Sequence, residues 1–289
     1  MPELPEVETI ARELRPLIVG RTITGAWLDW PNQVKHPSPE DFIAGLRGRQ
    51  ILAVERRAKW LVISLSGASV LAIQVKMTGQ LDVLPRDAPR DKHVHVVLAL
   101  DDGRDLRLRD TRKFGRVGLY AADQAGRLLD AFGPEPLDDE FRLTDFRRLL
   151  RARRARLKTL LMDQAFVAGV GNIYADEALW RAWLHPLRSA AALRPEQERA
   201  LYHSLREVLT EAIERRGSSV DDYRAPSGAG EMQNFLNVYG RTGKPCPRCS
   251  RPTRRIVIGA RSTHFCSWCQ RLPRAELSEA VSAMLAAAR

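Results

Sequence analysis

The sequence predicts an α+β fold with an N-terminal antiparallel β domain, a helical second domain and a C-terminal zinc-ribbon hairpin. Short apolar runs separated by turn residues fill residues 22–120, and no helical pattern alternates with them. Beyond residue 142 apolar residues recur at helical spacing, and two C-x-x-C pairs follow near the C-terminus. With 289 residues, of which 44% are hydrophobic, the chain can bury about two cores.

The first residues are predicted to begin a helix. Apolar residues recur at positions 7, 10, 11, 14 and 17, and this helix is expected to end between Pro16 and Gly20. Pro5 fits the first helical position, and Glu6 and Glu8 suit the positive end of the helix dipole. A helix start is the commoner meaning of such a segment.

The same segment also allows covalent chemistry. Removal of Met1 would leave Pro2 as the N-terminal residue, with a secondary amine that can attack an aldehyde-like sugar carbon and form an iminium. Glu3 and Glu6 lie close enough in sequence to transfer protons for that amine. On these residues alone, both interpretations stay open.

Predicted strands follow the helix. Turn signals such as Asp101-Asp102-Gly103 and Ser66-Gly67 separate several of them. Many short strands without alternating helices favour an antiparallel sandwich or barrel. The predicted strands are residues 22–30, 50–56, 60–65, 70–75, 94–100, 106–109 and 117–120.

The second half of the chain is predicted to be mainly helical. The segment Phe132-Gly133-Pro134-Glu135-Pro136 is typical of a linker, and helices are expected around residues 146–150, 173–183 and 195–215. Residues 217–231 are rich in glycine and serine, and we expect a mobile loop near a binding site. The alanine-rich residues 278–289 are predicted to form a last helix.

Composition indicates a polyanionic partner. The net charge is +11 and only seven of the 46 basic residues are lysine. Arginine binds phosphate in a bidentate manner, which favours nucleic acid, although a genomic bias towards arginine codons gives the same composition. The chain contains no apolar run of 18 residues and its N-terminus lacks an apolar signal core. We therefore expect a cytoplasmic protein without a membrane partner, associated with the nucleoid if DNA is the partner.

The cysteines have the spacing of a metal site. Cys246 and Cys249 form one C-x-x-C pair, Cys266 and Cys269 form the other, and 16 residues separate the pairs. This spacing predicts a closed four-cysteine zinc site with a structural role. Two disulfides are the alternative, which a reducing compartment disfavours. The residues between the pairs predict two strands around Gly259, so that zinc would fix a hairpin carrying Arg261 near its tip.

Two further segments suit phosphate. Gly169-Val-Gly171-Asn172 is predicted to open a helix whose N–H groups either hold a phosphate or simply make a tight turn. Residues 142–158 hold eight basic residues and one acidic residue, which is usually a solvated helix face. The position of this run just before the glycine turn favours a shared phosphate-binding surface.

A strand-end segment, Asp110–Gly115, contains an arginine and an aromatic residue at positions 112 and 114. In a loop, such a pair can enter a duplex as a wedge and fill the gap left by a flipped base. The alternative is a core aromatic beside a surface arginine. Met77 is likewise either core or wedge, and Lys59 is either a phosphate clamp or a surface lysine.

With these motifs in their order, the chain resembles the bacterial formamidopyrimidine-DNA glycosylases. The resemblance covers Pro2 to about Gln270 and rests on five separate motifs: Pro2–Glu8, Arg57-Ala58-Lys59, Asp110–Gly115, Gly169–Tyr174 and the terminal cysteine module. The related endonuclease VIII branch usually has glycine at the position of Leu4, so the first residues resemble it less.

The resemblance implies an N-terminal antiparallel β-sandwich with an N-terminal helix, a helix-two-turn-helix domain and a zinc finger. We expect these domain bounds: 2–131 for the sandwich, 132–141 for a linker, 142–243 for the helix-two-turn-helix domain with a lesion loop near 217–231, 244–270 for the zinc finger and 271–289 for a helical tail.

The resemblance also implies an activity. It implies removal of oxidised purines, notably 8-oxoguanine opposite cytosine and formamidopyrimidines, from double-stranded DNA, followed by cleavage at the abasic site. The enzyme would be a monomer with one structural zinc ion and no catalytic metal or redox cofactor.

By similarity, each matching residue has a role. Pro2 is the Schiff-base nucleophile, Glu3 the main proton donor, and Glu6 a supporting group. Lys59 is the proton donor of the first elimination, and Arg261 assists the last elimination and holds phosphate. The DNA-contacting positions are His93, Arg112, Arg154 and Asn172, and the void-filling set is Met77, Arg112 and Phe114.

Two other functions compete with this one. An endonuclease VIII-like enzyme would prefer oxidised pyrimidines, and a non-catalytic zinc-ribbon protein would bind lesions without cutting the strand. The presence of Pro2, Glu3 and Lys59 argues against the second. The chain departs from the family in its tail of about twenty residues after the last cysteine, and in details of the hairpin tip and the long loop.

Overall fold

The structure is a computed structural model that describes residues 1–220 and 223–288. Contacts divide the chain into two compact units. Unit 1 comprises residues 1–131 and 212–233, and unit 2 comprises residues 132–211 and 234–289. The domain bounds expected from the sequence stay a prediction.

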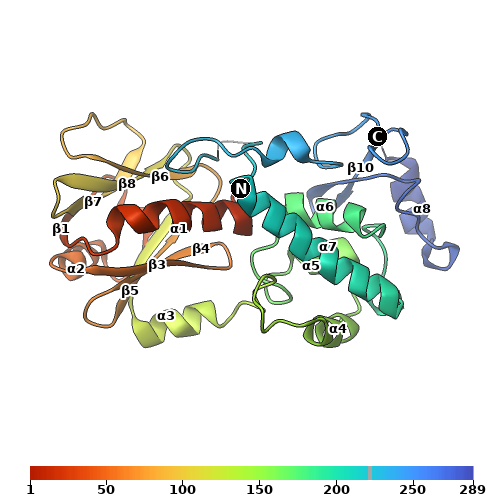
Figure 1. The fold of residues 1–289 in the computed structure, drawn as a ribbon, viewed down its shortest axis with the longest axis horizontal. Helices are drawn as coiled ribbons and strands as arrows, with labels where there is room; N and C mark the ends of the chain where they lie inside the picture. The colour runs from red at the N-terminus through yellow and green to blue at the C-terminus, as the bar shows by residue number, and fades with distance from the viewer. Residues whose placement is uncertain (221–222, 289) are drawn as a thin grey trace. The chain divides into compact units, whose positions relative to one another are not determined.

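Unit 1 begins with α1 (Leu4–Ile18), the helix predicted at the N-terminus. Its apolar stripe is buried and it packs against β3 (Ile51–Arg57) and β4 (Trp60–Leu65) (Figure 1). The sequence predicted Pro5 at the first helical position. In the structure Pro5 is the second residue of the helix, because Glu3 takes the N-cap position and Leu4 begins the helix.

In the described part of the chain, unit 1 contains two β-sheets. The first has the strand order β1-β7-β8-β6 and is antiparallel throughout. The second has the order β2-β9-β5-β4-β3 and is antiparallel except for the β2–β9 pair. The remaining strands are β1 (Ile23–Leu28), β2 (Val34–His36), β5 (Ser69–Gln74), β6 (Gly79–Pro85), β7 (Val94–Leu100), β8 (Arg104–Asp110) and β9 (Arg116–Ala121).

One apolar core joins the two sheets and α1. It combines side chains of the first sheet, such as Leu98 and Leu108, with side chains of the second, such as Ile63 and Ile73. Of the two alternatives that the sequence left open, a sandwich and a barrel, the structure is therefore the sandwich. Two short helices, α2 (Pro39–Leu46) and α3 (Ala122–Leu129), complete the unit and were not predicted.

Unit 2 is mainly helical. Its helices are α4 (Leu143–Arg151), α5 (Leu157–Met162), α6 (Asn172–Arg181), α7 (Pro195–Glu214), whose last turn belongs to unit 1, and, near the C-terminus, α8 (Glu279–Ala286) (Figure 1). Short 3-10 turns lie at Pro31–Gln33, Ala190–Ala192, Met232–Phe235 and Arg274–Glu276 of the chain. None of the helices in the described part of the chain is long and apolar enough to cross a membrane.

The hairpin of unit 2 pairs β10 (Arg254–Ile258) with β11 (Arg261–Phe265). Its two-residue loop, Gly259 and Ala260, has φ angles of 54° and 60°. Two positive φ angles in succession are typical of the tight turn whose twist matches that of a hairpin. The prediction of a turn at Gly259 that places Arg261 near the tip is confirmed.

Candidate functional site

The N-terminal residues are held in the interior of unit 1. Pro2 is buried, and the side chains of Glu3 and Glu6 are only 3% and 1% exposed. The backbone N–H of Glu3 donates to Oε2 of Glu6 at 2.8 Å, which closes the first turn of α1 from its N-cap. Pro2 is thus joined to a helix end whose position is fixed by burial and by this hydrogen bond.

Glu6 also binds a segment more than two hundred residues later in the chain. Its Oε1 accepts the backbone N–H of Ser218 at 2.8 Å, and its carbonyl oxygen accepts the Tyr223 hydroxyl at 3.3 Å. Burial, followed by the nearby Glu6 charge, raises the pKa of Tyr223, so this hydroxyl stays protonated as a donor. The sequence did not indicate this contact.

Gly217 explains how the later segment approaches so closely. Its φ is +77°, and a Cβ at this position would lie 2.8 Å from both Cγ and Oε1 of Glu6. Glycine therefore allows both the left-handed backbone at this position and the close approach of the segment to the Glu6 side chain. The described residues of 217–231 contain no helix or strand, in agreement with the loop expected there.

Lys59 lies in the two-residue turn between β3 and β4, where Ala58 has a φ of 53°. The charge of Lys59 acts on the pKa of a second lysine, Lys76. Burial lowers the pKa of Lys76, and the charges of Arg116 and Lys59 lower it further. This part of unit 1 therefore gathers positive charge, which favours an anionic ligand.

The predicted wedge residues meet in unit 1. Nη1 of Arg112 lies 3.3 Å from Sδ of Met77, and its guanidinium lies 4.7 Å from the centre of the Phe114 ring. Phe114 is 51% exposed, so the interpretation as a core aromatic is wrong for this residue. Met77 is half-buried and Arg112 is exposed.

Asp110 fixes the loop that carries these side chains. It is fully buried and accepts hydrogen bonds from the backbone N–H of Gly115 at 2.6 Å, from Gln33 at 3.0 Å and from the Thr78 hydroxyl. Its own N–H donates to the carbonyl oxygen of His93 at 2.8 Å, which ties the half-buried His93 to the same loop.

In unit 2 the four cysteines gather as predicted. All four Sγ atoms lie within 4.8 Å of one another, with 3.5 Å between Cys249 and Cys266 and 4.0 Å between Cys246 and Cys269. A tetrahedral zinc ion with Zn–S bonds of about 2.3 Å separates its sulfurs by about 3.8 Å. The donor set fits one structural zinc ion, and these distances exclude disulfides, whose S–S bond is ~2.05 Å.

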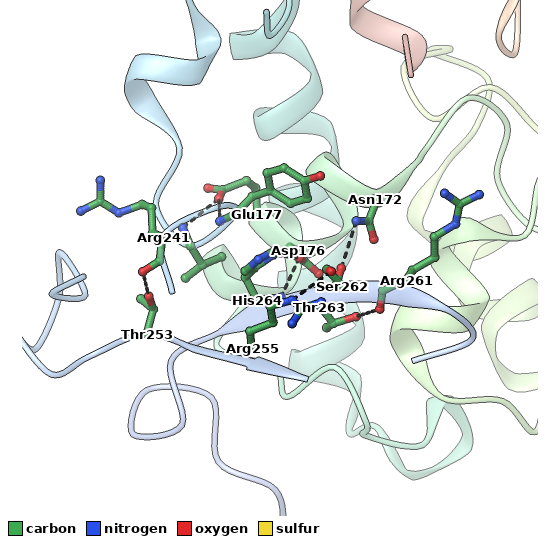
Figure 2. Close-up of polar contacts among 12 residues, drawn as sticks. Asn172, Asp176, Glu177, Arg241, Thr253, Arg255, Arg261, Ser262, Thr263 and His264 are labelled. Carbon is green, nitrogen blue, oxygen red and sulfur yellow. Dashed lines mark hydrogen bonds and ion pairs between the residues drawn. The ribbon is translucent and has the colours of Figure 1, made fainter. Parts of the chain in front are cut away.

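The hairpin is attached to α6 by polar contacts (Figure 2). Nδ2 of Asn172 donates to the carbonyl oxygen of Ser262 at 3.0 Å. Oδ2 of Asp176 accepts the backbone N–H of His264 at 2.8 Å, and its Oδ1 accepts Nζ of Lys158 at 2.6 Å. The glycine turn does open a helix, because Gly171 is the N-cap of α6.

The basic run 142–158 is not one open surface. Lys158 is buried in an ion pair with Asp176, so it does not contribute to the predicted phosphate surface. Arg151 and Arg147 pair with the buried Glu198. Arg154 is exposed, and its contact with DNA stays a prediction.

A buried carboxylate that the sequence did not single out organises the segment before the zinc finger. Glu177, on α6, accepts backbone N–H groups of Asn237, Val238 and Tyr239 at 2.9–3.0 Å. Burial raises the pKa of Glu177, and the same N–H groups oppose that shift. An acidic residue in the middle of an otherwise largely apolar helix was the available signal, but nothing local identified its partners.

Comparison with known proteins identifies the class. The formamidopyrimidine-DNA glycosylase N-terminal domain matches residues 1–117, the H2TH domain of the same enzymes matches 132–224, and the zinc finger found in FPG and IleRS matches 243–272. Together with the sandwich, the helical unit and the zinc hairpin, these matches define a DNA glycosylase.

The similarity extends over nearly the whole chain. The formamidopyrimidine-DNA glycosylase of Chloroflexus aurantiacus is 51% identical over 93% of this chain and 98% of its own length. That of Herpetosiphon aurantiacus is 48% identical over 93% of this chain and its full length. The chain belongs to the formamidopyrimidine-DNA glycosylase family.

Solved structures agree. Lactococcus lactis Fpg in complex with DNA containing an abasic site superposes with a TM-score of 0.88 at 38% identity, covering 93% of this chain and 100% of that chain. MutM (Fpg) of Thermus thermophilus has a TM-score of 0.84 at 44% identity, covering 93% and 98%. The predicted family and fold class are confirmed, whereas the roles of individual residues stay predictions.

Proposed function

We propose that this chain is a bifunctional DNA glycosylase and lyase of base-excision repair. It removes oxidised purines, 8-oxoguanine and formamidopyrimidines, from duplex DNA and then cleaves the strand at the abasic site. The observation that carries the proposal is the position of Pro2 at the start of α1. Its ring nitrogen becomes the N-terminal amine when Met1 is removed, and it adjoins a helix start held by the buried Glu3 and Glu6.

Base removal begins when the Pro2 nitrogen attacks C1′ of the damaged nucleotide. The bond from C1′ to the base breaks, the base leaves with its electron pair, and Glu3 supplies the proton that the reaction needs. Opening of the sugar ring leaves an iminium between Pro2 and C1′. Glu6 supports this step by fixing the backbone of Glu3 through the 2.8 Å hydrogen bond.

Strand cleavage follows from the iminium, because its positive charge makes the C2′ proton acidic. Loss of that proton breaks the bond from C3′ to its phosphate, and Lys59 protonates the leaving group. A second elimination breaks the bond from C5′ to its phosphate, assisted by Arg261. Water then hydrolyses the iminium and frees Pro2.

The remaining predicted residues bind the duplex. Arg154, Asn172 and His93 contact the DNA, and the cluster of Met77, Arg112 and Phe114 fills the space left by the flipped nucleotide. Support comes from the exposed Phe114 and from relatives that were solved with DNA containing Fapy-dG or an abasic site. Affinity should fall steeply with added salt, because many arginines contact phosphates.

The test is covalent trapping with borohydride. Intact mass first establishes that Met1 is absent; the protein is then mixed with duplexes containing 8-oxoguanine, formamidopyrimidine or thymine glycol and reduced. We expect an adduct with both purine lesions and much less of it with Pro2→Gly, whose N-terminal amine is primary and is not held in a proline ring. An adduct mainly on thymine glycol would instead establish an endonuclease VIII-like enzyme, and lesion binding without adduct or scission would establish a non-catalytic binder.

A further inference from the structure

The residues after the zinc finger are ordered against it, and we call residues 271–288 the C-terminal splint. The zinc-finger family match ends at residue 272. Relatives that match over 98–100% of their own length cover 93% of this chain, which leaves a segment of about this size without a counterpart in them. Its contacts are therefore a feature of this chain and not of those relatives.

The splint buries apolar side chains on the hairpin. Val281 of α8 is only 7% exposed and forms one core cluster with Leu187, Ile256 and Phe265. Further apolar side chains of the splint and of β10 pack partly buried against this cluster: Ile258, Leu272, Met284, Leu285 and Ala288. Burial of these groups favours the docked state of the splint.

This contact lies on the face of the hairpin opposite α6. Side chains alternate along a strand, so Arg261, Thr263 and Phe265 of β11 share one face, while Ser262 and His264 share the other. On the second face the His264 ring lies with its Nδ1 3.2 Å from Oδ2 of Asp176 on α6. The backbone of Ser262 and His264 also bonds to α6 along the edge of β11 (Figure 2). Phe265 belongs to the splint cluster, so the hairpin is held from both faces.

An ionic clamp fixes the start of the splint. The carboxylate of Glu276 accepts the backbone N–H of Ser189 at 2.6 Å and lies 3.3 Å from Nη1 of Arg156. It also lies 3.5 Å from Nε of Arg188, and its side chain is 12% exposed. The Glu276 carboxylate thus has one backbone N–H group and two guanidinium groups close to it, which neutralise its charge in the docked state.

We propose that the C-terminal splint and the zinc ion stabilise the same folded hairpin, and that Glu276 and Val281 are positioning residues for Arg261. Zinc fixes the two ends of the hairpin through the cysteine pairs, and the splint fixes its strands. Because both act on one folded state, each strengthens the binding of the other. The part that concerns Arg261 rests on the proposed function, whereas the coupling to zinc does not.

The coupling is tested by zinc release from the full-length protein to an excess of chelator, followed with a colorimetric zinc indicator. Val281→Asp removes the apolar anchor, and Ala283→Asp is its matched control on an exposed position of the same helix. We expect release about tenfold faster with Val281→Asp, in the range of ordinary coupling energies, and unchanged with Ala283→Asp. Equal rates for both variants and the wild type would overturn the proposal.

A second pair of variants, with milder substitutions, separates the coupling from a general loss of folding. Glu276→Gln weakens the clamp, and Glu279→Gln removes a charge from an exposed position close by. We expect Glu276→Gln to release zinc several-fold faster than Glu279→Gln with similar secondary structure by circular dichroism. If both behave alike, Glu276 has no positioning role.

The effect on Arg261 is read from products on abasic DNA. If the splint positions Arg261, Val281→Asp slows the second elimination and the product of the first accumulates, while borohydride trapping through Pro2 is unchanged. An unchanged product ratio with faster zinc release would remove the Arg261 part of the proposal. Failure of the proposed function is distinct, because then the wild-type protein forms no adduct at all.

Discussion

The two units present their key residues by different means. In unit 1, Pro2 adjoins a helix start in which the N–H of Glu3 binds Glu6 three residues away. In unit 2, Arg261 stands at the tip of a hairpin that lies between the two cysteine pairs and is bound by Asn172, which is 90 residues from Ser262. The first arrangement is mainly local in sequence, and the second is almost entirely non-local.

This difference has a physical consequence. A helix start with a buried apolar stripe retains its geometry as long as the core of unit 1 is folded. A short hairpin is marginal by itself and needs added stabilisation. We therefore expect perturbations of unit 2 to move Arg261 while Pro2 stays in place.

Loss of zinc should have the largest effect. Zinc binding contributes about 10–16 kcal/mol to the folding of isolated zinc-finger peptides, so Cys269→Ser should unfold the hairpin. Hydrogen exchange should show amides of β10 and β11 losing protection while α1 keeps its protection. Ser267→Ala, at an exposed position in the same knuckle, is the control. Equal loss of protection in α1 would show that the two presentations are not independent.

Next in size is the buried ion pair beneath the hairpin. Asp176→Asn leaves the Lys158 ammonium buried without a countercharge, which costs about 3–5 kcal/mol. Urea unfolding should show this loss in the transition of unit 2. The double variant Lys158→Met with Asp176→Leu should recover much of it, because two apolar groups replace the pair. No recovery would mean that the hydrogen bonds of Asp176 to His264 matter more than the charge.

The sequence predicts local features of both units well. The strands expected at residues 60–65 and 94–100 have those bounds in the structure, and the cysteine spacing identified the zinc site. These signals depend on residues that are neighbours in the chain. Strand β6 was missed because its Gly79 and Pro85 are both typical of turns, and its pairing with β8 makes it a strand.

Non-local contacts are where the sequence was insufficient. Lys158 stood in a run of basic residues and was grouped with a phosphate surface, although Asp176 draws it into the interior. The bond from Ser218 to Glu6 spans 212 residues and had no local signal. Charge patterns show which residues are ionised, but only the packed structure shows which ions face one another.

Lowering the pH should weaken unit 2 through His185. Burial, and then the charge of Arg156, lowers its pKa to about 4 from an ordinary value of 6.5. Between pH 6.5 and 4 the histidine therefore binds a proton in the unfolded chain but not in the folded chain. The free energy of unfolding should fall over this range by at most about 3 kcal/mol, and His185 should not affect it above pH 6.5.

The measurement is the slope of unfolding free energy against pH, compared with that of His185→Asn. Asparagine can still accept the backbone N–H that Leu187 donates to the ring. Protonation of the zinc-binding thiolates affects both proteins, so the difference in slope isolates the histidine. Equal slopes would show that His185 titrates normally in the folded protein.

The smallest effect tests a long-range contact of Glu6, the residue that binds the backbone N–H of Glu3 beside Pro2. Gly217→Ala puts a Cβ in a left-handed backbone, which costs about 1–2 kcal/mol, and within 2.8 Å of the Glu6 carboxylate. Gly20→Ala has the same backbone cost at φ +83°, with no described atom within 4 Å of the new Cβ. Thermal unfolding should therefore shift in both variants, and further in Gly217→Ala, where Glu6 must also move. Only Gly217→Ala should slow single-turnover base release, because it alone displaces Glu6 and with it the N–H of Glu3. If Gly20→Ala slows base release equally, the position of Pro2 depends on the general stability of unit 1. Pro2 would then depend on non-local contacts as much as Arg261 does.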